Sequence, residues 1–393
     1  PLTMPVGNYV GVLNCGQDSS FAGAKTPQGN QDANSVGDFF YPVPSGFLAL
    51  CTKSLPDVDV IPSENFNTVL WSGNGSATRS ITGVGFEPSM LWAKSRTSAS
   101  NHNLIDAVRG VDVRLLPAST LAEIDSAFFA SLDSDGFSLD NANDNDVNQS
   151  GQTYVAWNWK AGGTAVSNTN GSITSSVSAN PSAGFSIVSY TGDSSGNATV
   201  GHGLSKAPEM VIQKARSEAS RNWLIWHEAF NDYDKAMLFN TDVPADNRFG
   251  PNAPTASVFG LYNGQGNRNG TTAIAYCFHS VDSYSRVGSY IGNGNVDGPM
   301  VHCGFRPAYV MMKNTTTAGR GWAVIDAKRD TSNQAAKVLY PDSSAAEDSI
   351  YNQIDILATG FKLRSVNSYT NTSGDNYIFY AVAESPFKHT NAR

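Results

Sequence analysis

Charged residues, long apolar runs and helical patterns are all scarce in this chain of 393 residues. Asp, Glu, Lys and Arg make up 15% of the sequence, where about a quarter is usual. The formal net charge of −8 argues against nucleic acid or an anionic membrane as a partner, because phosphate binding needs clustered Lys and Arg. No apolar run approaches the ~20 residues of a membrane-spanning helix, so we expect no membrane insertion.

Cysteine is also rare, and the four residues Cys15, Cys51, Cys277 and Cys303 form no CxxC pair. They are too few for a disulfide scaffold. A bridge between Cys277 and Cys303 is one alternative, because the two lie in neighbouring repeats. Buried free thiols are the other, and we favour them because Cys is itself among the most buried residue types.

Catalytic signatures are missing as well. The sequence contains no HExxH, GxSxG or GxxxxGK[ST] motif. His227 and Asp326 fall at equivalent positions of different repeats, so a site that uses both must form between repeats. Asp106, Glu228 and Asp326 are not arranged in sequence as the carboxylate pair that cleaves glycosidic bonds. We therefore predict that the protein is not an enzyme.

A threefold internal repeat is the strongest positive signal. Each copy opens with an aromatic residue two positions before a glycine that is followed by Asn or Asp. A proline, an apolar run that ends in Lys, and three further apolar runs follow in the same order. The openings are Trp71-Ser72-Gly73-Asn74, Tyr190-Thr191-Gly192-Asp193 and Tyr290-Ile291-Gly292-Asn293.

Short apolar runs separated by turn residues every 8 to 15 positions predict an all-β fold of β-sandwiches. In the closing run of the first copy, Val155, Trp157 and Trp159 alternate with Tyr154, Ala156 and Asn158, as in a strand with two unlike faces. Helix-like spacing occurs only in variable segments such as 119–132 and 345–357, where we expect a short helix or a surface excursion.

The repeat divides the chain into five parts. We predict an N-terminal attachment or linker region at 1–65, sandwiches at 66–163, 184–282 and 283–393, and a flexible or extended linker at 164–183, which is rich in Gly, Ser, Thr and Asn. The N-terminus lacks the basic segment of a signal peptide. The first residue is not Met, so we expect a processed product or a piece of a longer protein.

Two sets of residues are candidate binding sites. The repeated aromatic and polar residues suit a sugar site, in which a ring stacks on a pyranose and amides bind hydroxyls; they are Trp71, Asn74, Tyr190, Asp193, Tyr290 and Asn293. The alternative, which we favour, is that these rings pack in the core or in turns. The loops that differ between copies, at 95–102, 216–221, 232–256 and 314–320, are better recognition candidates.

An Asn- and Asp-rich stretch is the best candidate for a metal site. Ca²⁺ takes six to eight oxygen ligands, which Asp140, Asp144 and Asp146 can help to supply. The cluster, which also includes Asp133 and Asp135, does not fit EF-hand spacing. A solvated turn is the alternative, and we favour it.

The repeat units resemble those of virion proteins from marine tailed phages. The resemblance is carried by the aromatic-Thr-Gly-Asn type of opening, by the strand that begins Gly304-Phe305-Arg306-Pro307, by the strand Trp322 to Asp326, and by the close from Tyr377 to Lys388. It covers about residues 66–393. The second unit departs from it, because it lacks Gly-Phe before Pro208 and has His227 where the others have Asp.

This resemblance implies three tandem concanavalin- or laminin-G-like jelly-roll repeats in a structural or tail-fibre component of the virion. It implies no catalytic residue and no required cofactor. We expect a homo-oligomer, with a trimer favoured, that contacts other virion proteins and a host-surface polysaccharide. Two alternatives remain: a capsid or tail decoration protein without a host ligand, and a glycan-degrading tailspike-type enzyme.

Overall fold

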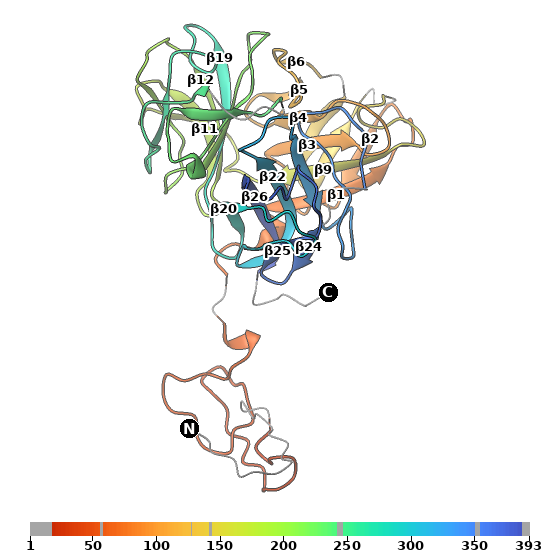
Figure 1. Cartoon of the computed structure of the whole chain (residues 1–393), viewed down its shortest axis with the longest axis vertical. Helices are drawn as coiled ribbons and strands as arrows, with labels where there is room; N and C mark the ends of the chain where they lie inside the picture. The colour runs from red at the N-terminus through yellow and green to blue at the C-terminus, as the bar shows by residue number, and fades with distance from the viewer. Residues whose placement is uncertain are drawn as a thin grey trace. The chain divides into compact units, whose positions relative to one another are not determined.

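The computed structural model describes residues 18–55, 58–126, 128–140, 144–241, 247–349 and 354–386. The chain forms two compact units, 1–57 and 58–393. The larger unit consists of antiparallel β-sheets (Figure 1), so the all-β prediction is confirmed. Among the described residues only three 3₁₀ turns are helical, namely η1 (Thr52–Ser54), η2 (Pro62–Glu64) and η3 (Glu228–Phe230), and none has the length or hydropathy of a membrane span.

In the smaller unit, the chain is organised around one buried carboxylate. Asp32 is 7% exposed. It accepts hydrogen bonds from the backbone amides of Asn34, Val36 and Ala49 at 2.7–2.9 Å. These bonds hold a loop whose surface carries large apolar side chains, namely Phe21, Tyr41, Phe47, Leu48 and Leu50.

Three large sheets dominate the unit from Val58 onward. The first has the order β1 (Phe66–Ser72), β9 (Thr153–Trp159), β3 (Met90–Ser95), β4 (Asn103–Asp106), β5 (Gly110–Leu115), β6 (Ile124–Asp125). The second runs β10 (Val166–Asn168), β11 (Ser175–Asn180), β12 (Phe185–Thr191), β19 (Thr272–Phe278), β14 (Met210–Ala215), β15 (Leu224–His227), β16 (Lys235–Leu238), β17 (Asn247–Arg248). The third runs β20 (Ser285–Ile291), β26 (Asn376–Pro386), β22 (Phe305–Asn314), β23 (Trp322–Asp326).

Each large sheet has a small companion sheet. These are β2 (Arg79–Thr82), β8 (Gly136–Leu139) and β7 (Phe129–Asp133); β13 (Ala198–Gly201) and β18 (Val258–Leu261); and β21 (Met300–His302), β25 (Gly360–Leu363) and β24 (Ile354–Leu357). Three separate apolar clusters each join side chains from one large sheet and its companion. In every case the opening aromatic residue contacts a phenylalanine of the companion sheet, as in the pairs Trp71–Phe137, Tyr190–Phe259 and Tyr290–Phe361.

The opposite faces of the three large sheets meet in one shared core. Its residues come from all three sheets and include Trp157 of β9, Tyr276 of β19 and Tyr380 of β26. Along β9, Val155, Trp157 and Trp159 face this shared core, whereas Tyr154 and Ala156 face the first sheet's own cluster. The predicted alternation along this strand is therefore confirmed, and both of its faces are buried.

The connecting segments differ in part from the sequence predictions. Residues 164–183 are not a flexible linker, because they contain β10 and β11, and β11 pairs with β12 in the register Ser175↔Tyr190. β10 is an exposed edge strand of the second sheet, whereas β11 lies between β10 and β12 and buries Ser175, Val177 and Ser178. The described residues of 119–132 and 345–357 form short strands and irregular loop, so the helix alternative is wrong and the surface excursion stays a prediction. Cys277 and Cys303 are buried free thiols, as favoured from the sequence, and Cys15 lies outside the described residues.

Candidate functional site

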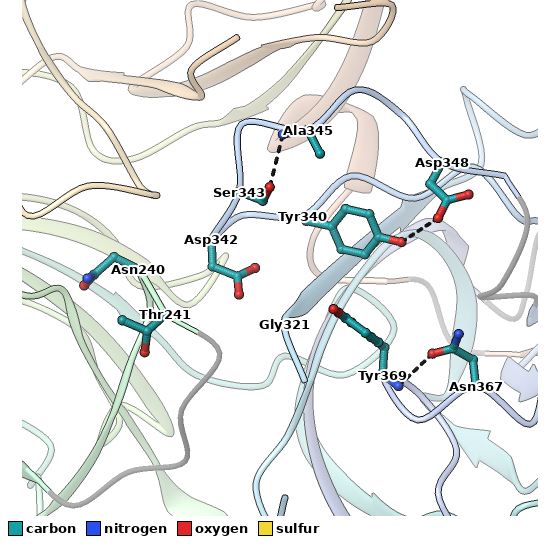
Figure 2. Close-up of a pocket in the computed structure, with 10 residues that line it drawn as sticks. All are labelled: Asn240, Thr241, Gly321, Tyr340, Asp342, Ser343, Ala345, Asp348, Asn367 and Tyr369. Carbon is teal, nitrogen blue, oxygen red and sulfur yellow. Dashed lines mark hydrogen bonds between the residues drawn. The ribbon is translucent and has the colours of Figure 1, made fainter. Parts of the chain in front are cut away.

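A groove of about 790 Å³ lies where the second and third sheets meet, and Figure 2 shows the side chains that line it. Two residues come from the end of β16 and the others from the third repeat. The lining residues are Asn240, Thr241, Gly321, Tyr340, Asp342, Ser343, Ala345, Asp348, Asn367 and Tyr369. Both tyrosine side chains are partly exposed, so the groove presents aromatic surface together with carboxylate, amide and hydroxyl groups.

Hydrogen bonds fix the side chains of the groove. The Tyr340 hydroxyl donates to Oδ2 of Asp348 at 2.9 Å. The amide of Trp322 donates to Oδ1 of Asp342 at 3.0 Å. The ring of Tyr340 lies edge-on to that of Tyr369, with centroids 5.7 Å apart and planes inclined by 63°. Two rings inclined in this way form a corner in the groove wall.

Residues of the first repeat support the wall of the groove through hydrogen bonds. Nδ1 of His102 accepts from the indole of Trp92 at 2.9 Å, so its Nε2 carries the hydrogen that faces the carbonyl of Tyr340 at 3.0 Å. Burial holds the pKa of His102 well below its usual range, which keeps the ring neutral. The amide of Ser100 donates to the carbonyl of Ser344 at 3.0 Å. All three sheets therefore contribute to this one site.

Two side chains approach Gly321 closely. A Cβ atom there would lie 2.9 Å from Oδ2 of Asp342 and 3.0 Å from Cε1 of Tyr369. Both distances are shorter than an ordinary van der Waals contact. The absence of a side chain on Gly321 thus leaves the carboxylate and the ring side by side in the groove.

The repeated aromatic residues predicted to stack on a sugar are buried. Trp71, Tyr190 and Tyr290 are 7%, 4% and 9% exposed. Their ring N–H or O–H groups donate to the backbone carbonyls of Val147, Gly266 and Thr370 at 2.8–2.9 Å. These rings have no open face for a ligand, and they agree with the packing interpretation that the sequence favoured.

The polar partners of these rings shape turns. Asn74, Asp193 and Asn293 are exposed, and each donates its amide hydrogen to the side chain of a buried asparagine from the same repeat. Those asparagines are Asn148, Asn267 and Asn371, each 0% exposed. Each exposed residue also accepts from a backbone amide two positions ahead, as in an Asx turn. Their repetition in the sequence therefore reflects a repeated turn.

The predicted calcium ligands are not gathered into one site. Asp146 forms an ion pair with Arg114 at 2.9 Å and accepts from the amide of Asn101. Asp144 accepts from the amide of Asp146, and Asp140 is exposed. In the part of the chain that the structure describes, no three His, Cys, Asp or Glu side chains lie close enough together to hold a metal ion.

Two of the three carboxylates considered for glycan cleavage form buried ion pairs, whereas the third, Glu228, is exposed. Asp106 pairs with Arg109 and Asp326 with Arg329, in both cases at 2.5 Å with side chains 0% exposed. Asp106 also accepts from Tyr276 of the second sheet, and Asp326 accepts from Trp157 of the first. Of the loops predicted to carry recognition, 232–256 supplies Asn240 and Thr241 to the groove, and 95–102 supports its wall.

Sequence reasoning missed most of the groove. Its wall is the segment from Tyr340 to Asp348, which falls in the variable part of the third unit. The signal that was available is its composition, since Tyr340-Pro341-Asp342-Ser343 combines an aromatic ring, a carboxylate and a hydroxyl. The other wall comes from a different repeat, which no local pattern reveals.

The chain was compared with family models, curated proteins and solved structures. A family model described as "Domain of unknown function (DUF7483)" matches residues 61–386, which is more than half of the chain and nearly all of its larger unit. The comparisons with curated proteins and with solved structures returned no match. From the extent of the family match, the chain belongs to the family described as Domain of unknown function (DUF7483).

Proposed function

We propose that this protein is a non-enzymatic structural component of a phage virion, a fibre component that attaches the particle to a host-surface glycan. The observation that carries the proposal is the shared core, in which three large sheets from one chain pack face to face. A body built in this way is rigid. It holds its variable loops and the groove in fixed positions, as attachment to a surface requires.

The three large sheets also support a common origin for the repeats. Their central strands have the same relative order, β1-β9-β3-β4, β12-β19-β14-β15 and β20-β26-β22-β23. In each, the opening strand pairs with the closing strand. We interpret them as three copies of one concanavalin- or laminin-G-like jelly-roll sandwich, each completed by its small companion sheet.

The N-terminal unit is the proposed attachment region to other virion proteins. Tyr41, Phe47 and Leu50 are 74%, 68% and 84% exposed. Exposed aromatic and aliphatic side chains at this density are typical of surfaces that bind another protein. Phe21 and Phe40, whose ring centroids lie 5.7 Å apart, extend the same apolar surface.

Labelling the chain on particles tests the proposal. An antibody against residues 58–393 should label tail fibres in electron micrographs, and the purified chain should compete with particles for adsorption to host cells. Label on the capsid without competition would instead favour the decoration protein. Release of reducing ends from host polysaccharide by the purified chain would establish the tailspike-type enzyme and contradict our proposal.

The oligomeric state is a separate part of the proposal. The fibre resemblance favours a homotrimer, although the chain already packs three sheets around one core. Mass photometry of the purified protein should give three times the chain mass of 41.8 kDa. A single species at the chain mass would mean that the internal threefold packing replaces a trimer of separate chains.

A further inference from the structure

We propose that the groove between Asn240 and Tyr369 is a binding site for a non-acidic saccharide, that is, a neutral or amine-bearing sugar. The inference deepens the proposed attachment function and rests on it. It differs from the sugar site predicted from the repeat, because none of the repeated aromatic residues lines this groove.

The shape and aromatic content of the groove fit a sugar. A volume of about 790 Å³ accommodates a short oligosaccharide. Tyr340 and Tyr369 are partly exposed, and their rings are inclined by 63° to each other. A pyranose presents its C–H face to one such ring and its edge to the other, which buries apolar surface without desolvating the hydroxyl groups.

The polar groups are chiefly acceptors placed around these rings. Asp342 uses Oδ1 to accept from the amide of Trp322, and its Oδ2 lies beside Gly321, 2.9 Å from the place that a Cβ atom would take there. Asp348 accepts from Tyr340 and lies beside the same corner. Sugar hydroxyl and ammonium groups donate hydrogen bonds, and those to a carboxylate are about twice as strong as neutral ones.

The charge of the lining residues sets the predicted specificity. Two of them are carboxylates, and none of the lining residues that the structure describes is Lys, Arg or His. An acidic sugar would bring a further negative charge beside these two carboxylates. A neutral sugar avoids that repulsion, and an ammonium group gains attraction from both carboxylates.

The groove is also preorganised. The wall from Tyr340 to Asp348 is held by hydrogen bonds to Ser100 and His102 of the first repeat. The amide of Glu347 donates to the carbonyl of Arg96 at 2.8 Å. Side chains already fixed in position lose little conformational entropy when a ligand binds.

Calorimetric titration of the full chain with three oligosaccharide probes tests this inference. The probes are a chitosan oligomer with free amines, a neutral malto-oligosaccharide and an oligouronate. We expect the chitosan oligomer to bind most tightly, with an affinity that falls as salt screens the carboxylates. The neutral probe should bind more weakly, and the oligouronate should not bind.

Two variants with matched controls assign binding to the groove. Tyr369→Ala should weaken binding of the chitosan and neutral probes at least tenfold, whereas Tyr233→Ala, at a tyrosine 45% exposed elsewhere, should not. Asp342→Asn should weaken the chitosan oligomer selectively. The fold accepts this change, because Asn240 makes the same bond to Trp223 that Asp342 makes to Trp322. The exposed Asp112→Asn is its control.

The outcomes separate this inference from the proposed function. Unchanged binding by Tyr369→Ala, a preference for the oligouronate, or no binding of any probe by the wild-type chain would overturn the groove as a saccharide site. The proposed function survives each of those results if labelled wild-type chain still adsorbs to host cells. It fails if the chain is not on the particle, whatever the groove binds.

Discussion

The indole nitrogen of Trp157, on the last strand of the first sheet, donates a hydrogen bond to Oδ2 of Asp326 in the third sheet at 3.0 Å. Asp326 is 1% exposed and is also paired with Arg329. The same relationship joins the second sheet to the first, since the hydroxyl of Tyr276 donates to Oδ2 of Asp106 at 2.6 Å. In both cases a side chain on the closing strand of one repeat donates a hydrogen bond to a buried carboxylate of another sheet.

A second set of contacts runs in the same direction around the shared core. The indole of Trp223 donates to the carbonyl of Leu116 at 3.0 Å, and that of Trp322 donates to Leu238 at 3.5 Å. His102 completes the set with Tyr340. The second sheet thus contacts the first, the first contacts the third, and the third contacts the second. This cyclic order closes the three sheets of one chain into a ring.

Among the described residues, the interface between the second and third sheets has no counterpart of the buried ion pairs at the other two. His227 and Phe230 occupy the positions that Asp106 and Arg109 occupy in the first sheet. The chain itself connects these two sheets through the short turn between β19 and β20. The buried ion pairs Asp106–Arg109 and Asp326–Arg329 lie at the interfaces that the first sheet forms with the second and with the third.

Tyr276→Phe removes one of the buried bonds with little change in volume. We expect the free energy of unfolding to fall by about 1–3 kcal/mol, because Asp106 then loses a donor in a site that water does not reach. Chemical denaturation monitored by tryptophan fluorescence measures this change. Tyr233→Phe, at an exposed tyrosine, should change stability by less than ~0.5 kcal/mol. Equal stability of Tyr276→Phe and wild type would contradict the role given to this bond.

Arg96→Gln removes one of the contacts between the first and third sheets. Arg96 makes a two-point ion pair with Glu347, with both distances at 2.9 Å. We expect a loss of about 1–2 kcal/mol, because Arg329 still pairs with Glu347. Hydrogen exchange should speed up at the amides of Ser100 and Glu347, which bridge the same interface. Arg268→Gln is the control, because its pair with Glu218 is largely exposed and should leave both amides unchanged.

Acidification should destabilise the protein through its buried histidines. Burial lowers the pKa of His202 and of His227 from 6.5 to about 4. Between these values the unfolded chain binds protons that the folded chain does not, so the free energy of unfolding falls as pH drops from about 6.5 to 4. The loss reaches at most roughly 3 kcal/mol for each histidine.

Denaturant midpoints at several pH values measure this effect. The variant His227→Asn should flatten the pH dependence, because the Asn side chain offers an acceptor for the amide of Ala229, as Nδ1 of His227 does at 3.1 Å, and does not titrate. His302→Gln, at an exposed histidine, should leave the pH dependence unchanged. A profile that stays the same in His227→Asn would show that this ring does not titrate as expected.

Local sequence patterns predicted the strands well, but they gave no information about how the sheets pack against one another. The alternation of Val155, Trp157 and Trp159 with smaller residues predicted a strand with two unlike faces. It did not reveal that the tryptophans face two other sheets, since those contacts join residues far apart in the chain. The strands at 166–168 and 175–180 were missed because their short, mostly polar side chains have the composition of a linker, although Ser175, Val177 and Ser178 are buried.

The buried lysines are a further case in which composition is a poor guide. Lys94, Lys214 and Lys313 end equivalent strands and are each 0% exposed. Their ammonium groups donate to backbone carbonyls of the loops that follow, such as that of Ser95 at 2.7 Å from Lys94. A charged residue at the end of an apolar run looks like a surface residue in sequence. Only the folded loop supplies the carbonyl groups that accept hydrogen bonds from the ammonium group and so offset the cost of burying its charge.

The repeated glycine of the opening motif gives the most direct test of the fold. A Cβ atom on Gly292 would lie 2.2 Å from the carbonyl oxygen of Thr372, and on Gly73 and Gly192 it would lie 2.0 and 2.4 Å from a carbonyl oxygen. Glycine is needed there because another backbone segment approaches closely. The three copies therefore share a steric requirement, which explains why this motif marks the start of each sheet.

Gly292→Ala should lower the free energy of unfolding by about 1–3 kcal/mol or more, because the backbone near Thr372 must move to admit the methyl group. Gly196→Ala is the matched control, since a Cβ atom there meets nothing within 4 Å. Removing the freedom of a glycine in the unfolded chain should make that variant neutral or slightly more stable. Denaturation of both variants beside the wild type measures the difference. If Gly292→Ala proved as stable as Gly196→Ala, close approach would not explain why glycine recurs in all three copies.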